Sequence, residues 1–161
     1  MTGLGLAVLR LTLAVVFVAH GAHELFGVWA GPGVGPGGVQ TSAAHFAALG
    51  LHPESLMAIA AGLVQLLGGV LVGVGWLARW ASIALIAYLS IGVWKEQLKW
   101  GLFLNWTGTA NQGHGLEYSI ALGGALVCLV LAGAGEWSVD GLRTRSAASR
   151  AAGRARLRGK V

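Results

Sequence analysis

The chain has 161 residues, of which 55% are hydrophobic and only 11% charged, with a mean hydropathy of +0.70. Soluble domains carry about 25% charged residues, so this composition excludes an ordinary soluble domain and indicates a membrane protein. Glycine is frequent, at 27 residues, but follows no three-residue repeat, which excludes a collagen-like chain.

The net charge of +5 belongs to the C-terminal segment. Nucleic-acid binding requires a basic folded surface and a recognisable module. The sequence offers neither, so no nucleic-acid partner is expected. We instead expect residues 141–161 to form a basic, disordered cytoplasmic tail close to anionic lipid. Seven of the 11 basic residues lie in this tail: Arg143, Arg145, Arg150, Arg154, Arg156, Arg158 and Lys160.

Four apolar runs predict helices that cross a bilayer core of about 30 Å. They cover about 4–26, 55–76, 80–97 and 116–134. The first run has a weak basic start and no small-residue cleavage site, so we expect a membrane span and not a removed signal peptide. The predicted fold is all-α, a four-helix transmembrane bundle comprising residues 1–140.

The connections between the runs differ in character. The stretch AGPGVGPGG at 30–38 predicts a loop. After it, Thr41 or Ser42 can cap a short helix that reaches Leu49. This helix is too short to span, so we expect it to be interfacial or re-entrant within the first outer loop. Residues 98–115 predict a polar, aromatic connection.

Four spans place both termini on one side of the membrane. The basic tail predicts that this side is the cytoplasm, so we expect a multi-pass protein of the cell membrane with both termini in the cytoplasm. Arg79 falls on the same side and agrees, whereas Lys95 and Lys99 fall outside. Tryptophans then form an inner belt and an outer belt. The inner belt comprises Trp76, Trp80 and Trp137, and the outer belt Trp29, Trp94, Trp100 and Trp106.

Titratable residues gather at the predicted outer ends of the spans. All five histidines lie there, together with four of the five glutamates. On the first helix, Arg10, Leu13, Phe17, His20 and Glu24 follow a helical spacing and share one face. We expect this face to point into the bundle, because a charge facing lipid costs several kcal/mol. Arg10 is expected to reach the inner headgroups.

Three interpretations are open for His20, His23 and Glu24. They can form a solvated helix end, a proton or quinone site, or a metal site. A metal shell would be completed by His114 or Glu117. The spacing alone is weakly specific for metal, so quinone is the favoured cofactor and a metal ion the less favoured one.

Two further polar residues lie in the middle of the predicted spans, Gln65 and Tyr88. Interhelical hydrogen bonding is their expected role. Gly69 and Gly73, on the same helix as Gln65, have the Gly-x-x-x-Gly spacing that permits close helix contact.

The order of these features resembles the DoxX family of small four-helix membrane proteins, over roughly residues 6–142. The resemblance rests on four segments. They are Arg10 with Phe17–Gly27, the segment FAALGLHP at 46–53, the segment GLVQLLGG at 62–69, and Gly115–Tyr118 followed by GAGEWSVD at 133–140.

Two positions depart from the family pattern. The family usually has glutamate where Gln65 stands and often lysine where Glu24 stands, whereas Glu117 matches. The resemblance implies a link to membrane-bound oxidoreductase assemblies, including thiosulfate:quinone oxidoreductase, and to thiol and oxidative-stress systems. A shared fold does not fix the function.

The leading expectation is a membrane subunit that anchors an oxidoreductase partner and contacts quinone at the outer end of the bundle. It is not expected to act as a stand-alone enzyme. The quinone candidates are His20, His23, Glu24, His114 and Glu117. Two alternatives stay open: a metal-binding or transport protein that uses the same outer cap, and a ligand-free membrane scaffold.

Overall fold

A computed structural model describes residues 2–31 and 34–158, with the side chains of all but 2, 148 and 151–158. This part of the chain is all-helical and contains no strand, which confirms the predicted all-α class. The elements in order are α1 Thr2–Phe26, α2 Gly38–Ala48, α3 Glu54–Val74, α4 Ala78–Gly92, a π-helical turn η1 Val93–Gln97, a 3₁₀ turn η2 Leu98–Trp100, α5 Glu117–Ala132 and α6 Val139–Arg158.

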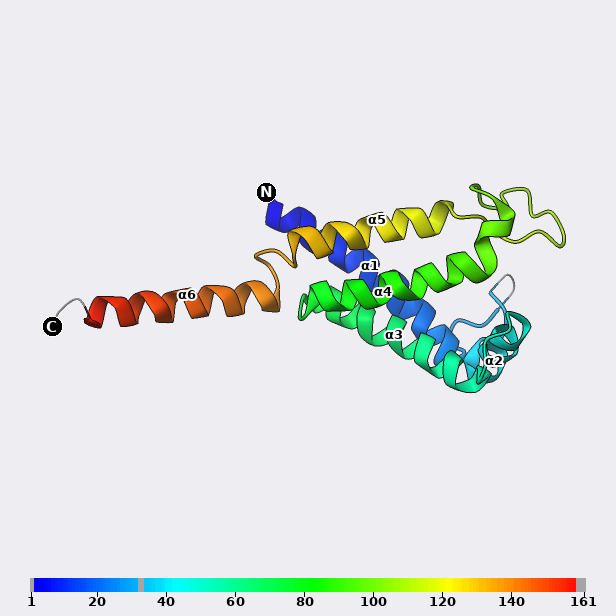
Figure 1. Cartoon of the computed structure of the whole chain (residues 1–161), viewed down its shortest axis with the longest axis horizontal. Coiled ribbons are helices and arrows are strands. Elements are labelled where there is room, and N and C mark those ends of the chain that lie inside the picture. Colours follow the sequence, from blue (N-terminus) through cyan, green and yellow to red (C-terminus); the bar gives the residue numbers. More distant parts are fainter. Residues whose placement is uncertain (1, 32–33, 159–161) are drawn as a thin grey trace.

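Four of the helices enclose one apolar core. α1 packs along α3, α3 on α4 and α4 on α5, and α5 also touches α1 (Figure 1). Because each helix contributes apolar side chains to the same interior, the core is continuous across all four. Its buried members are Leu13, Phe17, Val72, Ala81, Leu85, Leu126 and Leu129.

Glycines bring α1 and α3 into close contact. A Cβ atom on Gly21 would lie 2.5 Å from the backbone nitrogen of Leu66, and one on Gly69 would lie 3.0 Å from that of Val18. A Cβ on Gly73 would lie 2.9 Å from Ala14. The Gly-x-x-x-Gly spacing of α3 therefore faces α1, where the small residues let the two backbones approach.

The two helices are staggered along their length. Arg10 of α1 contacts Gly73 near the end of α3, and Leu25, near the end of α1, packs over Gly62. The first two turns of α3 thus extend beyond the end of α1. α2 lies at this end of the molecule and packs on both helices (Figure 1). The stagger leaves the space in which the candidate site lies.

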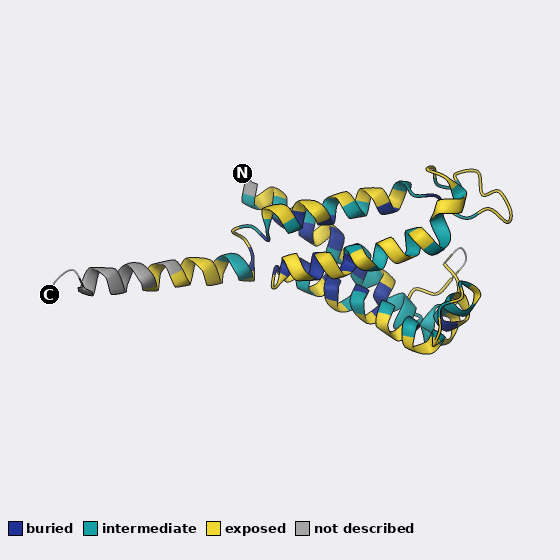
Figure 2. Ribbon diagram, in the orientation of Figure 1, coloured by how far each residue is buried: buried dark blue, intermediate teal, exposed yellow. Residues whose placement is uncertain are grey.

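The outer faces of the helices are exposed (Figure 2), and many of the residues on them are large and apolar. On α1, Leu4, Val8, Leu11 and Val15 recur at helical spacing and are all more than half exposed. α1 from Gly3 to Phe26 and α3 from Glu54 to Val74 are each long and apolar enough to cross a membrane, while the apolar helix α5 is shorter. Such a surface is unfavourable in water and favourable against lipid.

The C-terminal segment differs from the sequence prediction. We expected residues 141–161 to be disordered; up to residue 158, where the described part of the chain ends, they belong to α6, which is helical from Val139 to Arg158 and leads away from the other helices (Figure 1). Ser138 caps its start, since its hydroxyl accepts a hydrogen bond from the Gly141 N–H at 2.9 Å. Alanine and arginine, which recur along α6, are among the strongest helix formers.

Candidate functional site

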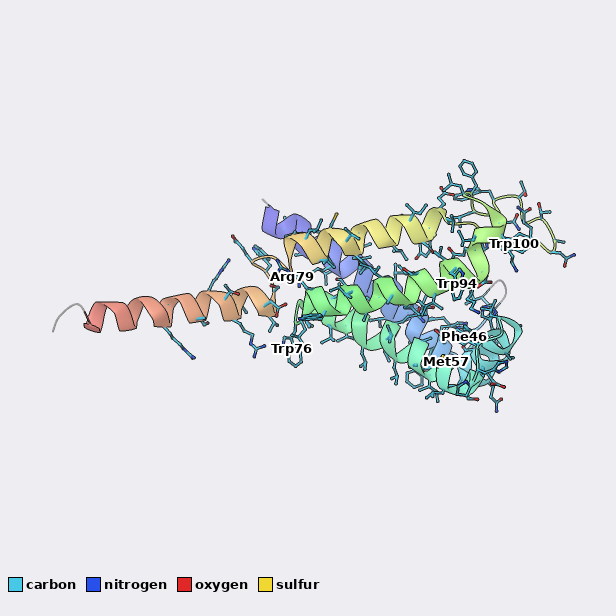
Figure 3. The ribbon with its side chains drawn as sticks, in the orientation of Figure 1. Phe46, Met57, Trp76, Arg79, Trp94 and Trp100 are labelled. Atoms are coloured by element: carbon cyan, nitrogen blue, oxygen red, sulfur yellow. The ribbon has the colours of Figure 1, made fainter. Side chains whose placement is uncertain are left out.

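A cavity of about 810 Å³ opens beyond the end of α1. α1, α2, α3 and α4 with η1 line it, and the loop before α2 contributes Val34 and Gly37. Phe46 of α2 and Met57 of α3 lie on its wall, at the end of the molecule far from α6 (Figure 3). Apolar residues such as Leu49, Val64 and Ile91 make up about half of the rest of the wall.

Glu24 and Gln65 form the polar pair of this cavity. Gly21 lets α1 approach α3 closely, and Glu24 lies one turn further along α1 on the same face. The side-chain amide of Gln65 donates a hydrogen bond to the Glu24 carboxylate and also faces the Ala61 carbonyl at 3.4 Å. Gln65 is only 3% exposed. Gln65 lies eleven residues into α3, or about 16 Å along the helix axis, so the hydrogen bond holds Glu24, in the last turn of α1, against the middle of α3.

Histidines from two helices complete the polar part of the wall. His20 lines the cavity from α1. The Nδ1 atom of His23 lies 2.8 Å from the Val28 carbonyl oxygen, which fixes the ring beside the loop before α2. On α2, His45 Nε2 lies 3.3 Å from the Glu96 carboxylate of η1. Tyr88 of α4 also lines the cavity, opposite α1.

Two of the five quinone candidates lie elsewhere. The Glu117 carboxylate accepts a hydrogen bond from the Leu104 N–H at 3.2 Å, and His114 Nδ1 accepts one from the Asn105 N–H at 3.2 Å. Both side chains hold the 98–116 connection and neither lines the cavity. Glu117 and His114 therefore do not join the polar group around Glu24, whose side-chain partner is Gln65.

A model of the DoxX family matches residues 5–95. The chain belongs to the DoxX family. No curated protein matches the chain. No solved structure matches it.

DoxX proteins are membrane proteins, often linked to redox systems. A lipid bilayer is therefore the environment of this chain, as its exposed apolar faces require. The match covers Arg10, His20, Glu24, Gln65 and Tyr88, and it ends before the segments at 115–118 and 133–140.

The positions of His20, His23 and Glu24 also bear on whether this DoxX protein binds a metal ion in the cavity. Among residues 2–31 and 34–158, no group of three or more His, Cys, Asp and Glu side chains is placed to hold a metal ion. The ring of His23 faces a backbone carbonyl and Glu24 faces Gln65, so these two do not converge with His20 on one point.

The polar cavity residues outside the predicted set come from α2 and η1. Thr41, Ser42 and His45 project from one face of α2, and Lys95 and Glu96 line the cavity from η1. The Ser42 hydroxyl also donates to the Glu24 carbonyl oxygen at 3.2 Å, which ties α2 to the end of α1. The helical spacing of residues 41, 42 and 45 is the only sequence signal for this face.

A second polar cluster holds the opposite end of this DoxX protein together. We expected Arg10 to reach the headgroups, but it is buried at 2% exposure. Its guanidinium donates to the Gly73 carbonyl at 3.2 Å and to the Trp137 carbonyl, because the chain before α6 folds back over α1. Gly75, in the left-handed region at φ +70°, passes so close that a Cβ would clash with the guanidinium.

Asp140 belongs to the same cluster. Its carboxylate accepts hydrogen bonds from the Leu77 and Ala78 N–H groups, each at 3.2 Å, and so caps the start of α4. Its own N–H donates to the Gly75 carbonyl at 2.9 Å. The Ser-x-Asp segment at 138–140 therefore joins α6 to the turn between α3 and α4, and its role is structural.

Proposed function

We propose that α1, α3, α4 and α5 form a four-helix transmembrane bundle in the cell membrane, with both termini in the cytoplasm. Support comes from the apolar outer faces and from the position of α6 beside the end that carries Trp76 and Arg79 (Figure 3). Cytoplasmic loops and tails are enriched in Lys and Arg, and α6 holds most of the basic residues. The cavity then opens toward the outer half of the bilayer.

We infer that the protein is a subunit of a membrane-bound redox system and that its cavity takes the ring of a quinone. The observation that carries this proposal is the cavity itself, which joins apolar walls to polar side chains from α1, α2, α3 and α4. Ligand sites commonly combine apolar walls with a few placed polar groups. Its volume lies in the range of cavities that hold small organic ligands.

The side chains fit the two parts of such a ligand. A quinone carbonyl oxygen accepts hydrogen bonds, which His20 and the Tyr88 hydroxyl can donate. Phe46, Leu49 and Ile91 offer apolar contacts to the ring and its hydrocarbon tail. An oxidoreductase partner anchored on this subunit would supply the electrons, and the histidines would exchange protons with the ring oxygens.

The test is quinone retention by purified protein. The wild-type chain and a Glu24→Gln variant are purified in a neutral detergent, extracted with organic solvent and assayed for quinone. Glu54→Gln is the matched control, because Glu54 starts α3 at the same end but does not line the cavity. We expect quinone, counted together with its reduced hydroquinone form, in the wild type and the control and a reduced total in Glu24→Gln.

Partner anchoring is tested separately, by cross-linking in native membranes followed by mass spectrometry. Recovery of an oxidoreductase supports the redox assembly. If purified protein retains no quinone and cross-links to no oxidoreductase, the ligand-free scaffold is the better description. A stoichiometric metal ion that is lost on His20→Ala would instead favour the metal-binding alternative.

A further inference from the structure

We propose that the cavity selects the hydroxyl-bearing, reduced form of an aromatic ring over the form whose ring oxygens are all carbonyls. The inference rests on the proposed function only in taking an aromatic redox ring as the occupant. It is drawn from the hydrogen-bond donors and acceptors of the cavity residues that are not used in contacts among these residues.

The deep polar pair presents acceptors to a ligand. The Gln65 amide nitrogen faces both the Glu24 carboxylate and the Ala61 carbonyl. Both neighbours are acceptors, so the amide N–H groups must point to them and the amide oxygen is left for a ligand. The second oxygen of the Glu24 carboxylate also accepts hydrogen bonds and, when ionised, cannot donate one.

Two of the histidines add to this acceptor character. His23 Nδ1 lies 2.8 Å from the Val28 carbonyl oxygen, so it carries the proton, and the Nε2 atom of the neutral ring is an acceptor. His45 Nε2 lies 3.3 Å from the Glu96 carboxylate. It donates to that carboxylate, which leaves Nδ1 of the neutral ring as an acceptor.

Few donors remain to serve a carbonyl oxygen. The Tyr88 and Thr41 hydroxyls and the His20 ring can each donate or accept. The Lys95 ammonium lies 4.8 Å from the centre of the Trp94 ring, on η1 at the rim. A ring hydroxyl can donate to Glu24 or Gln65 while accepting from Tyr88, whereas a carbonyl oxygen leaves the deep acceptors without a partner.

Selectivity of this kind is strong when the polar groups are buried. A site built to bond a ligand hydroxyl rejects an analogue without it, because its own polar groups are then unpaired. We expect the hydroxyl form to bind at least about tenfold more tightly than the matched form without a donor, which corresponds to about 1.4 kcal/mol.

The test uses a ligand pair that differs only in the donor. The full chain is placed in nanodiscs of phosphatidylcholine, and the binding of 4-octylphenol is compared with that of its methyl ether, 4-octylanisole. Empty nanodiscs correct for partition into lipid. We expect the wild type to prefer the phenol by about tenfold or more, and equal affinities would overturn the inference.

Variants locate the preference. Glu24→Gln should bring the two affinities to within about twofold of each other, because it replaces the carboxylate acceptor with an amide that can also donate. Glu54→Gln keeps the same charge change outside the cavity and should retain the wild-type preference. A preference that persists unchanged in Glu24→Gln would contradict the assignment. The wild-type comparison decides the inference even if a variant does not fold.

A second ligand pair separates this inference from the proposed function. The same nanodiscs are titrated with decyl-benzoquinone and with its hydroquinone, kept reduced by dithionite. Tighter binding of the hydroquinone supports both the selectivity and the proposed quinone binding. Equal binding of the two contradicts the selectivity but leaves quinone binding intact. If neither quinone form binds and the phenol does not bind either, both proposals fail.

Discussion

Gln65 is the residue on which the polar part of the cavity depends. It is buried in α3 and gives Glu24 its hydrogen-bond partner. Gln65→Leu should therefore lower the free energy of unfolding by about 1–3 kcal/mol, because it leaves a carboxylate unpaired in an apolar environment. Thermal unfolding in one detergent, followed by circular dichroism, measures the change. Gln40→Leu on the exposed face of α2 is the control, and equal melting of the two variants would refute this role.

Arg10 is the residue on which the polar cluster at the opposite end of the molecule, next to the start of α6, depends. It is the only donor recorded for the Gly73 and Trp137 carbonyls among the side chains that the structure describes. Arg10→Met should destabilise the protein by about 2–3 kcal/mol, since charged hydrogen bonds in a buried site are lost. Arg79→Met removes an exposed guanidinium with one contact of 3.4 Å and should change stability by less than about 0.5 kcal/mol. The same unfolding assay compares them, and a harmless Arg10→Met would show that the cluster does not hold the chain before α6.

At the scale of the helices, the contact between α1 and α3 sets the depth of the cavity. Gly21→Ala would place a Cβ 2.5 Å from backbone atoms of α3, so the helices must separate. We expect a loss of about 1–3 kcal/mol and weaker binding of quinone in the cavity. Gly5→Ala, in the same helix, meets no atom within 4 Å and should be neutral or slightly stabilising. Unfolding and quinone binding, measured on both variants, test this, and equal behaviour would exclude a close-packing role for Gly21.

The helices were more predictable than their relative positions. The apolar runs predicted α1, α3, α4 with η1, and α5 to within two residues at each end, because hydrophobic length and helix-stopping glycines are local signals. The stagger that puts Glu24 against Gln65 depends on where Gly21 and Gly62 meet, and no local pattern encodes that. For the same reason the sequence grouped His114 and Glu117 with Glu24, and placed Arg10 at the headgroups. The charge of the tail suggested disorder, whereas alanine and arginine propensity produced α6.

At the scale of the whole molecule, the proposed topology puts the 98–116 connection outside and α6 inside. Cys128, the one native cysteine, is exposed on α5 and is first replaced by serine. Cysteines are then introduced singly, as Thr107→Cys in the connection and Ser146→Cys in α6, both at exposed positions. A membrane-impermeant maleimide should label the first in intact cells and the second only after lysis. Labelling of Ser146→Cys in intact cells would reverse the orientation.

Photolabelling with an azido-quinone tests most directly whether the cavity between α1, α2, α3 and α4 is where the ring binds. The protein is labelled in phosphatidylcholine nanodiscs, with and without excess unlabelled quinone, and the adducts are mapped by mass spectrometry. We expect saturable labelling of cavity residues, with Phe46, Met57 and Tyr88 as the principal positions. Labelling should fall strongly in Gly21→Ala, which forces α1 and α3 apart, and persist in Gly5→Ala. Adducts confined to lipid-facing residues such as Leu11 and Val15, with no competition by unlabelled quinone, would contradict a quinone site in this cavity.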